Sequence, residues 1–266
     1  MRGVRRSGVV RGTLAVTLLS SVVVCPAQAA SHTISAGTVV YDSGTYGSDD
    51  IIVDGATALL QINSGGVPLT NFLDVENGGT LDNSGTIERS GPSHRGVQGG
   101  NGTVINRATG AIYSQNGTGI LLYDGGSVTN SGLVDAAIYG IDIQGATGSV
   151  TNSNGGIVRS GSDGIILFSG GTVTNTGAGT IVENGVSILD GGGTLTNAHG
   201  AEIYGGVHMR DAAIVKNLDD SSITGVSAVF LEDGGSVTND TDASIVGTDN
   251  GVKWDVDNDP DAASHL

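Results

Sequence analysis

The sequence predicts an all-β chain that folds as a parallel β-helix, with about 20–24 residues and three short strands in each coil. The first observation is that close copies of the stretch Gly125-Gly126-Ser127-Val128-Thr129-Asn130 recur at intervals of 20 to 24 residues. The second is that aliphatic residues return at fixed places in each interval, separated by Gly, Asn and Asp. The copies close at Asn83, Asn106, Asn130, Asn152, Asn175, Asn197, Asn217 and Asn239.

Two aliphatic slots in each repeat predict two short strands with inward side chains. The first slot lies two residues before the closing Asn and holds Leu81, Val104, Val128, Val150, Val173, Leu195, Val215 and Val237. The second follows the Asn by four to six residues and holds Ile87, Ile112, Val134, Ile157, Ile181, Ile203, Ile223 and Ile245. We expect each Asn to adopt a left-handed turn conformation and to bond its stacked neighbours as a ladder.

A third slot is an alternating aliphatic pair, which predicts a third strand because period-two alternation places both members on one face. The pairs are Ile120/Leu122, Ile141/Ile143, Ile165/Leu167, Val186/Ile188, Val207/Met209, Val229/Leu231 and Val252/Trp254. A helical solenoid is excluded because no stretch keeps i, i+3, i+4 spacing, and a leucine-rich repeat would need more Leu. Gly-rich disorder is disfavoured because a disordered chain has no reason to repeat its apolar positions.

Residues 1–29 have the pattern of a secretory signal peptide. Four Arg residues precede an apolar core at residues 14–24, which is too short to span a bilayer, and Ala27-Gln28-Ala29 fits a cleavage site. Cleavage would remove Cys25, the single cysteine, and leave 7 Lys and Arg against 27 Asp and Glu. A formal charge near −20 repels nucleic acid and anionic membranes. We therefore expect an exported protein with no nucleic-acid partner.

The rest of the chain divides into three parts by how closely it follows the repeat. Residues 30–77 follow it loosely and are predicted to form one or two coils that cap the N-terminal end. Residues 78–254 form the regular repeats, and residues 255–266 form an acidic tail. The tail begins like a calcium loop, but Pro260 stands where that loop needs glycine and Leu266 where it needs Glu.

Catalytic and metal motifs are missing from the sequence. It contains no G-x-S-x-G, HExxH or P-loop pattern, and its five His residues show no metal-ligand spacing. The adjacent pairs Asp49-Asp50 and Asp219-Asp220 are poor acid/base dyads, since neighbours on a strand point to opposite faces. We predict no catalytic residue, no cofactor and no metal site. The only basic candidates in the central coils for a carbohydrate-active site are Arg159 and Arg210.

Two regions are candidate contact surfaces for a partner. One is the proline-marked interruption at residues 91–96, because loops that leave a solenoid often carry contacts. The other is the outward side of the third strand, where alternation exposes apolar and aromatic residues on an acidic rod, unless a neighbouring segment covers them. Together they give the candidate partner-binding residues Ser93, His94, Arg95, Leu121, Tyr123, Ile166, Phe168 and Phe230.

The export signal, the cysteine-free mature chain and the G-G-[ST]-[VL]-T-N units resemble passenger regions of bacterial autotransporters of the self-associating adhesin type. The resemblance covers about residues 78 to 251 and implies a right-handed parallel β-helix that is displayed at, or released from, a Gram-negative surface. It also implies a translocating C-terminal β-barrel, to which nothing after Trp254 is similar. The chain is thus predicted to be a non-enzymatic adhesin or self-association module for host or bacterial cell-surface molecules. The alternative is a carbohydrate-active β-helix enzyme.

Overall fold

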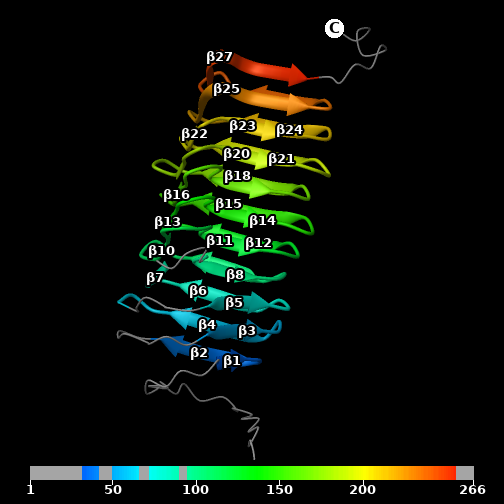
Figure 1. The fold of residues 1–266 in the computed structure, drawn as a ribbon. Coiled ribbons are helices and arrows are strands. Elements are labelled where there is room, and N and C mark those ends of the chain that lie inside the picture. The colour runs from blue at the N-terminus through cyan, green and yellow to red at the C-terminus, as the bar shows by residue number, and fades with distance from the viewer. Residues whose placement is uncertain (1–31, 42–49, 66–71, 90–94, 256–266) are drawn as a thin grey trace, which may run out of the picture.

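Parallel strands stack along the whole molecule as a β-solenoid, which confirms the predicted fold class. The computed structural model describes residues 32–41, 50–65, 72–89 and 95–255, and these contain no helix. Figure 1 shows the chain climbing one column, from β1 and β2 at one end to β27 at the other. Because each coil repeats the same path, residues about 22 positions apart become direct neighbours in the sheets.

One sheet is built from the repeated Gly-Ser-Val-Thr-Asn segments, and we name it the Asn sheet. Its ten strands pair in parallel and in coil order. They are β2 (Gly37–Tyr41), β4 (Ala58–Ile62), β6 (Thr80–Asn83), β9 (Thr103–Asn106), β12 (Gly126–Asn130), β15 (Gly148–Ser153), β18 (Gly171–Thr176), β21 (Gly193–Ala198), β24 (Ala213–Asn217) and β26 (Gly235–Asn239).

Two further ladders hold the other strands, and both run through the long strands β25 (Ser222–Glu232) and β27 (Ser244–Asp255). The second ladder also contains β7 (Thr86–Arg89), β10 (Ala111–Ser114), β13 (Leu133–Ala136), β16 (Ile157–Arg159), β19 (Ile181–Val182) and β22 (Glu202–Tyr204). The third ladder also contains β1 (His32–Ile34), β3 (Ile51–Asp54), β5 (Leu73–Glu76), β8 (Val97–Gly99), β11 (Ile120–Leu122), β14 (Ile141–Ile143), β17 (Ile165–Leu167), β20 (Val186–Ile188) and β23 (Val207–Met209).

The predicted aliphatic slots fill one continuous core between the three ladders. In the third ladder both members of each pair from Ile120/Leu122 to Val229/Leu231 point inward and are almost fully buried. The prediction for the second slot is wrong in two coils, where Val158 and Val182 are buried in place of Ile157 and Ile181. In both coils the residue in register with the buried Val134 is the Val that follows the predicted Ile. A shift of one residue exchanges the inward and outward positions of a strand.

The eight closing Asn residues stand in register and form a ladder of side-chain hydrogen bonds, as predicted. Each side-chain amide donates to the carbonyl oxygen of the next at 2.8 to 2.9 Å, from Asn83 through to Asn239. All but Asn239 are buried. The predicted left-handed backbone is wrong for these residues, because each lies within a β-strand and none of the eight has a positive φ. Positive φ occurs instead at Asn77, Asn154 and Asn184, which lie outside the strands.

Glycine begins several strands of the Asn sheet because two coils meet there backbone to backbone. Gly171 has a φ of +133°, and a Cβ atom on it would lie 2.1 Å from the carbonyl oxygen of Gly148 in the coil below. A side chain would therefore force the coils apart, which explains why glycine returns at this place in the repeat.

The last described coil leaves part of the core open. Val252 and Trp254, predicted as an inward pair, are 37% and 47% exposed, although Val229 and Leu231 beneath them are fully buried. In the described residues β27 pairs only with β25. In contrast, Ile34 and Tyr41 in the first described coil are 3% and 8% exposed.

Candidate functional site

The predicted contact stripe lies on the outward face of the third ladder, and its residues align as expected. Read along the coils, the outward row is Gln98, Leu121, Asp142, Ile166, Ser187, His208, Phe230 and Lys253. The predicted exposure is wrong for Leu121 and Ile166, whose side chains are only 3% and 5% exposed. These two side chains are therefore not available as an open apolar surface.

Gln98 flanks Leu121 in this row and Ser187 flanks Ile166. Each of the two is hydrogen-bonded to a side chain that lies outside the strands. Arg95 donates from Nη1 to Oε1 of Gln98 at 3.2 Å, next to Leu121. Ser187, next to Ile166, donates from Oγ to Oδ1 of Asp163 at 2.6 Å. Strand alternation alone predicts which way a side chain points, but it says nothing about what lies over it.

Arg95 and Tyr123 are two predicted contact residues that the structure brings together. The Arg95 guanidinium lies over the Tyr123 ring, 5.5 Å from its centre, and that ring is 38% exposed. Ser93 and His94 lie outside the described residues. Phe168 is half-buried and lies two coils from Tyr123, with Gln144 of the intervening coil between them in register. The predicted stripe is thus several separate contacts, with no continuous aromatic surface.

Phe230 lies inside a stack of its own near the C-terminal end. The His208 ring stacks on it with ring centres 4.9 Å apart, and Nζ of Lys253 lies 4.4 Å from its ring centre. Glu232 pairs with Arg210 and lies within ion-pair distance of His208 Nε2, at 3.1 Å, although that contact does not have hydrogen-bond geometry. Phe230 therefore packs between neighbouring coils of its own chain.

The same row contains a buried carboxylate that was not among the predicted site residues. Asp142 is 2% exposed; its Oδ2 accepts from Gln144 at 2.9 Å, and its Oδ1 has no partner. Burial raises the pKa of Asp142 to about 6, the negative charge of Asp163 adds to the rise, and Gln144 and Arg95 oppose it. Its position directly after Ile141 marks it as outward, but nothing in the repeat signals that it is covered.

Arg89, the last residue of β7, is a second buried charged residue and lies nearer the N-terminal end of the solenoid than Asp142. Its guanidinium is 2% exposed, and its Nε and Nη1 atoms have no hydrogen-bond partner. Burial lowers the pKa of Arg89 to about 10, against the opposing effect of Asp74 and Asp50. Burial also raises the pKa of Asp74. Because the Arg89 side chain is buried, it offers no open site.

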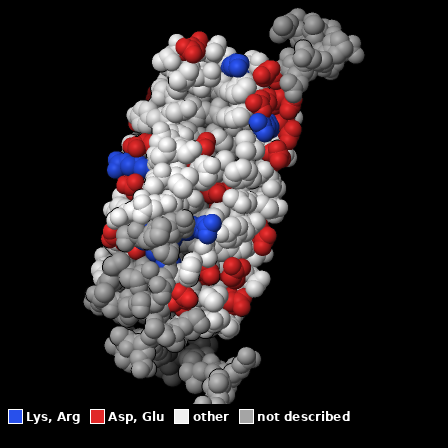
Figure 2. All heavy atoms as spheres, in the orientation of Figure 1, with Lys and Arg blue, Asp and Glu red and all other residues white. Residues whose placement is uncertain are grey.

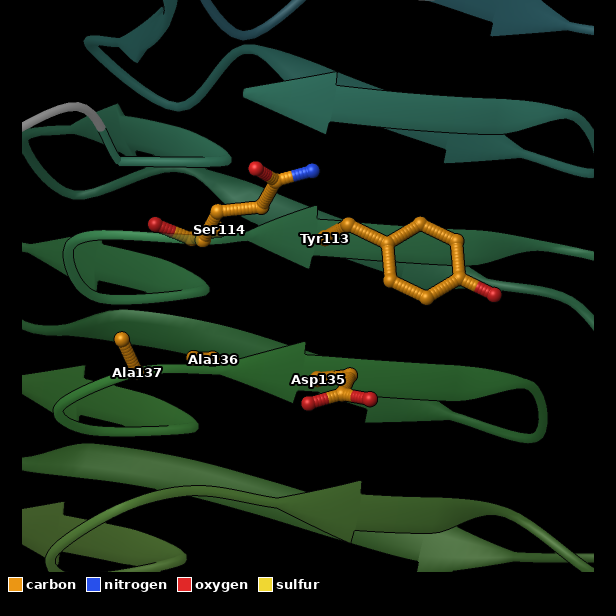
Figure 3. A pocket seen from close by; sticks show the side chains of 6 residues that line it. Tyr113, Ser114, Asp135, Ala136 and Ala137 are labelled. Atoms are coloured by element: carbon orange, nitrogen blue, oxygen red, sulfur yellow. The ribbon is translucent and has the colours of Figure 1, made fainter. Parts of the chain in front are cut away.

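An open hollow lies on the second ladder, at a place where the sequence predicted no site. Its volume is about 270 Å³, and it is lined by Tyr113, Ser114, Gln115, Asp135, Ala136 and Ala137. Figure 3 shows these side chains coming from two neighbouring coils, with Tyr113 and Ser114 on one and Asp135, Ala136 and Ala137 on the next. In register, Ala136 of the second coil stands beside Ser114 of the first, and Asp135 stands beside Tyr113.

Two polar groups at this hollow have no partner in the described part of the chain. No hydrogen bond or ion pair there engages the Asp135 carboxylate or the Tyr113 hydroxyl. The Gln115 amide donates from Nε2 to Oε1 of Glu88 at 2.9 Å, which fixes the amide and leaves its carbonyl oxygen free of any described donor. The aligned repeats could have indicated the pair, because Tyr113 and Asp135 each follow a buried residue of the second slot.

The basic residues that the sequence offered for a carbohydrate-active site are each held by one glutamate. Arg159 donates from Nε to Oε1 of Glu183 at 3.0 Å, and Arg210 pairs with Glu232. The face in Figure 2 carries many acidic and few basic side chains. Arg107, Arg159 and Arg210 are the Lys or Arg residues that form ion pairs in the described ranges.

No group of three His, Cys, Asp or Glu side chains within the described ranges is arranged to hold a metal ion. In the same ranges, no helix has the length and apolar character needed to cross a bilayer. No family model matches the chain, and neither a curated protein nor a solved structure is significantly similar to it.

Proposed function

We propose that this chain is an exported, autotransporter-like passenger that acts as a non-enzymatic adhesin or self-association module. It binds molecules of host or bacterial cell surfaces through the flanks of its rod. The observation that supports this best is the hollow beside Tyr113, where unpaired polar groups stand open on stacked strands. Strands fixed on both sides hold such groups in place before binding, which reduces the entropy cost of association.

Export to the cell surface is supported by the sequence features at the N-terminus. Residues 1–29 have the order of a signal peptide, and the chain after them has no cysteine. The formal net charge of −16 for the whole chain keeps an extended, glycine-rich rod soluble.

A carbohydrate-active enzyme is the second candidate, and one observation favours it. Asp142 lies close enough to Arg95 and Asp163 for both charges to affect its pKa, which is raised to about 6. A carboxylate with a raised pKa beside a second carboxylate is the arrangement that glycoside hydrolysis uses. Against this, Asp142 is 2% exposed, so a polysaccharide has no direct access to it.

Attachment of coated beads tests the adhesin proposal. Beads carrying the purified full chain are mixed with each other, with bacteria and with cultured host cells, beside beads that carry an unrelated acidic protein of similar net charge. We expect clumping or cell attachment with the full chain only. Equal behaviour of both bead types would remove the proposal, because simple charge would then explain any contact.

Release of new reducing ends from a panel of neutral and acidic polysaccharides tests the enzyme candidate. The full chain is compared with Asp142→Asn and Asp163→Asn, and we expect no release from any of the three. Depolymerisation by the native chain that either substitution abolishes would establish the enzyme and contradict the proposed non-enzymatic role.

A further inference from the structure

We propose that the Tyr113 hollow is a binding site for one neutral pyranose unit of a surface glycan. The inference rests on the proposed function and names the class of molecule that the rod recognises. The hollow is formed by six residues of two adjacent coils and has a volume of about 270 Å³. That is just below the usual range for small-molecule pockets, so it suits a single ring rather than a long segment of chain.

The polar groups at the hollow are mostly hydrogen-bond acceptors. The Asp135 carboxylate accepts only, and the Gln115 carbonyl oxygen is also an acceptor, while one N–H of its amide donates to Glu88. The Tyr113 hydroxyl can both donate and accept. A ligand that satisfies this set must bring several donors at once, as the hydroxyl groups of a sugar do.

The apolar groups at the hollow suit the other side of a sugar ring. The Tyr113 ring is half-buried and stands on β10, and Ala136 and Ala137 of the next coil add apolar surface to the hollow. Figure 3 shows the ring set beside the position of Asp135 in the next coil. An aromatic face next to fixed polar groups is the combination that positions an amphipathic ring, which presents C–H groups on its faces and hydroxyls at its rim.

Charge selects a neutral sugar over an acidic one. Tyr113 pairs in register with Glu88 on one side and Asp135 on the other, so a carboxylate lies about one strand spacing, near 4.8 Å along the ladder, from it in each direction. The nearest cation in register, Arg159, is engaged by Glu183 at 3.0 Å. A uronate or a sialic acid would meet this negative site without a free cation to pair with.

Ligand-observed NMR with the full-length chain tests the site. The neutral probes are the methyl glycosides of glucose, galactose, mannose, fucose and N-acetylglucosamine. Methyl glucuronide is the anionic probe, and butylammonium is the cationic probe. We expect saturation transfer to at least one neutral glycoside. Tyr113→Ala should weaken its binding at least about tenfold, and Asp135→Asn about fivefold, while Tyr113→Phe keeps the ring and most of the affinity.

Tyr204→Ala is the matched control, because Tyr204 is an exposed tyrosine on the same ladder, away from the hollow. It should bind like the native chain, and circular dichroism should show equal folding of all variants. The inference is overturned if no neutral glycoside binds, if the glucuronide or butylammonium binds better, or if Tyr113→Ala binds normally. Beads that still attach to cells with Tyr113→Ala would overturn this site alone, whereas native beads that never attach would overturn the proposed function.

Discussion

Single residues stabilise this solenoid by closing hydrogen bonds between coils, and the Asn ladder is the clearest case. Asn152 accepts from Asn130 at 2.8 Å and donates to Asn175 Oδ1, to the Gly156 carbonyl and to the Ile181 carbonyl. Its side chain is fully buried, so water cannot replace these partners. The amides thus satisfy polar groups that the narrow core would otherwise leave unpaired.

Asn152→Ala should therefore lower the free energy of unfolding by about 2–3 kcal/mol, because several buried groups lose a partner at once. Urea unfolding followed by circular dichroism measures the change. Asn239→Ala is the control: Asn239 ends the ladder and is exposed, so its substitution should cost less than about 1 kcal/mol. Equal losses at both positions would contradict a stabilising role of burial.

Asp142 makes stability depend on pH in the direction opposite to that of a salt-bridged carboxylate. Its folded pKa of about 6 lies above the ordinary value of 3.8, so the folded chain binds the extra proton between these values and loses stability as pH rises. Asp142→Asn should be more stable than the native chain at pH 8, by on the order of 1–3 kcal/mol, and equally stable near pH 4. Thermal unfolding at both pH values checks this; a variant that is less stable at pH 8 would contradict it.

Predictions for single residues were confirmed where the same residue returns at the same place in each coil. They were wrong where the exposure of a side chain depends on what covers it. The stacked amides of the eight Asn residues follow from equal spacing alone. The burial of Leu121, Ile166 and Asp142 does not, because the repeat shows that they point outward and says nothing of what covers them. The pairing of Tyr113 with Asp135 was missed because the two residues lie on neighbouring coils and become neighbours only when the strands stack.

In each strand of this fold alternate residues face inward. In the short strands of the second ladder, the sequence alone does not show which residue is the inward one. β16 holds Ile157 and Val158 side by side, and both suit a β-strand. Register with Val134 selects Val158 for the core. The sequence predicts that the strand exists. Because both adjacent residues are aliphatic, it does not show which of them faces the core.

Val158→Thr should destabilise the chain by about 1–2 kcal/mol, since it buries a hydroxyl group in an apolar core without changing the volume of the side chain. Ile157→Thr, on the half-buried outward side of the same strand, should cost clearly less. Chemical denaturation of the two variants compares them directly. A larger loss for Ile157→Thr would mean that β16 faces the other way.

The molecule as a whole is a one-dimensional stack, so its stability varies along the axis. Each coil contacts the coils next to it, and the core runs without interruption from Ile34 to Leu231. The last described coil exposes Val252 and Trp254. Hydrogen exchange should therefore be slowest in β12 to β18 and fastest in β26 and β27; uniform protection along the column would contradict a stack of locally supported coils.

At this scale the sequence predicted most of the fold, because a period of 20 to 24 residues with three apolar slots leaves few other architectures. The first coils are less regular: β1 and β2, and then β3 and β4, contribute to the third ladder and the Asn sheet, whereas the described second ladder begins at β7. Function could be predicted less well, because the repeated residues build the scaffold and the open groups lie between them.

The most direct test of the central claim, that the rod is a binding module, is the attachment of beads coated with the full chain to cells. Attachment above that of beads coated with a protein of equal net charge is the predicted result, and neutral glycosides should reduce it. Attachment no greater than that of the charge-matched control, together with release of reducing ends from polysaccharide, would contradict the account and favour an enzyme.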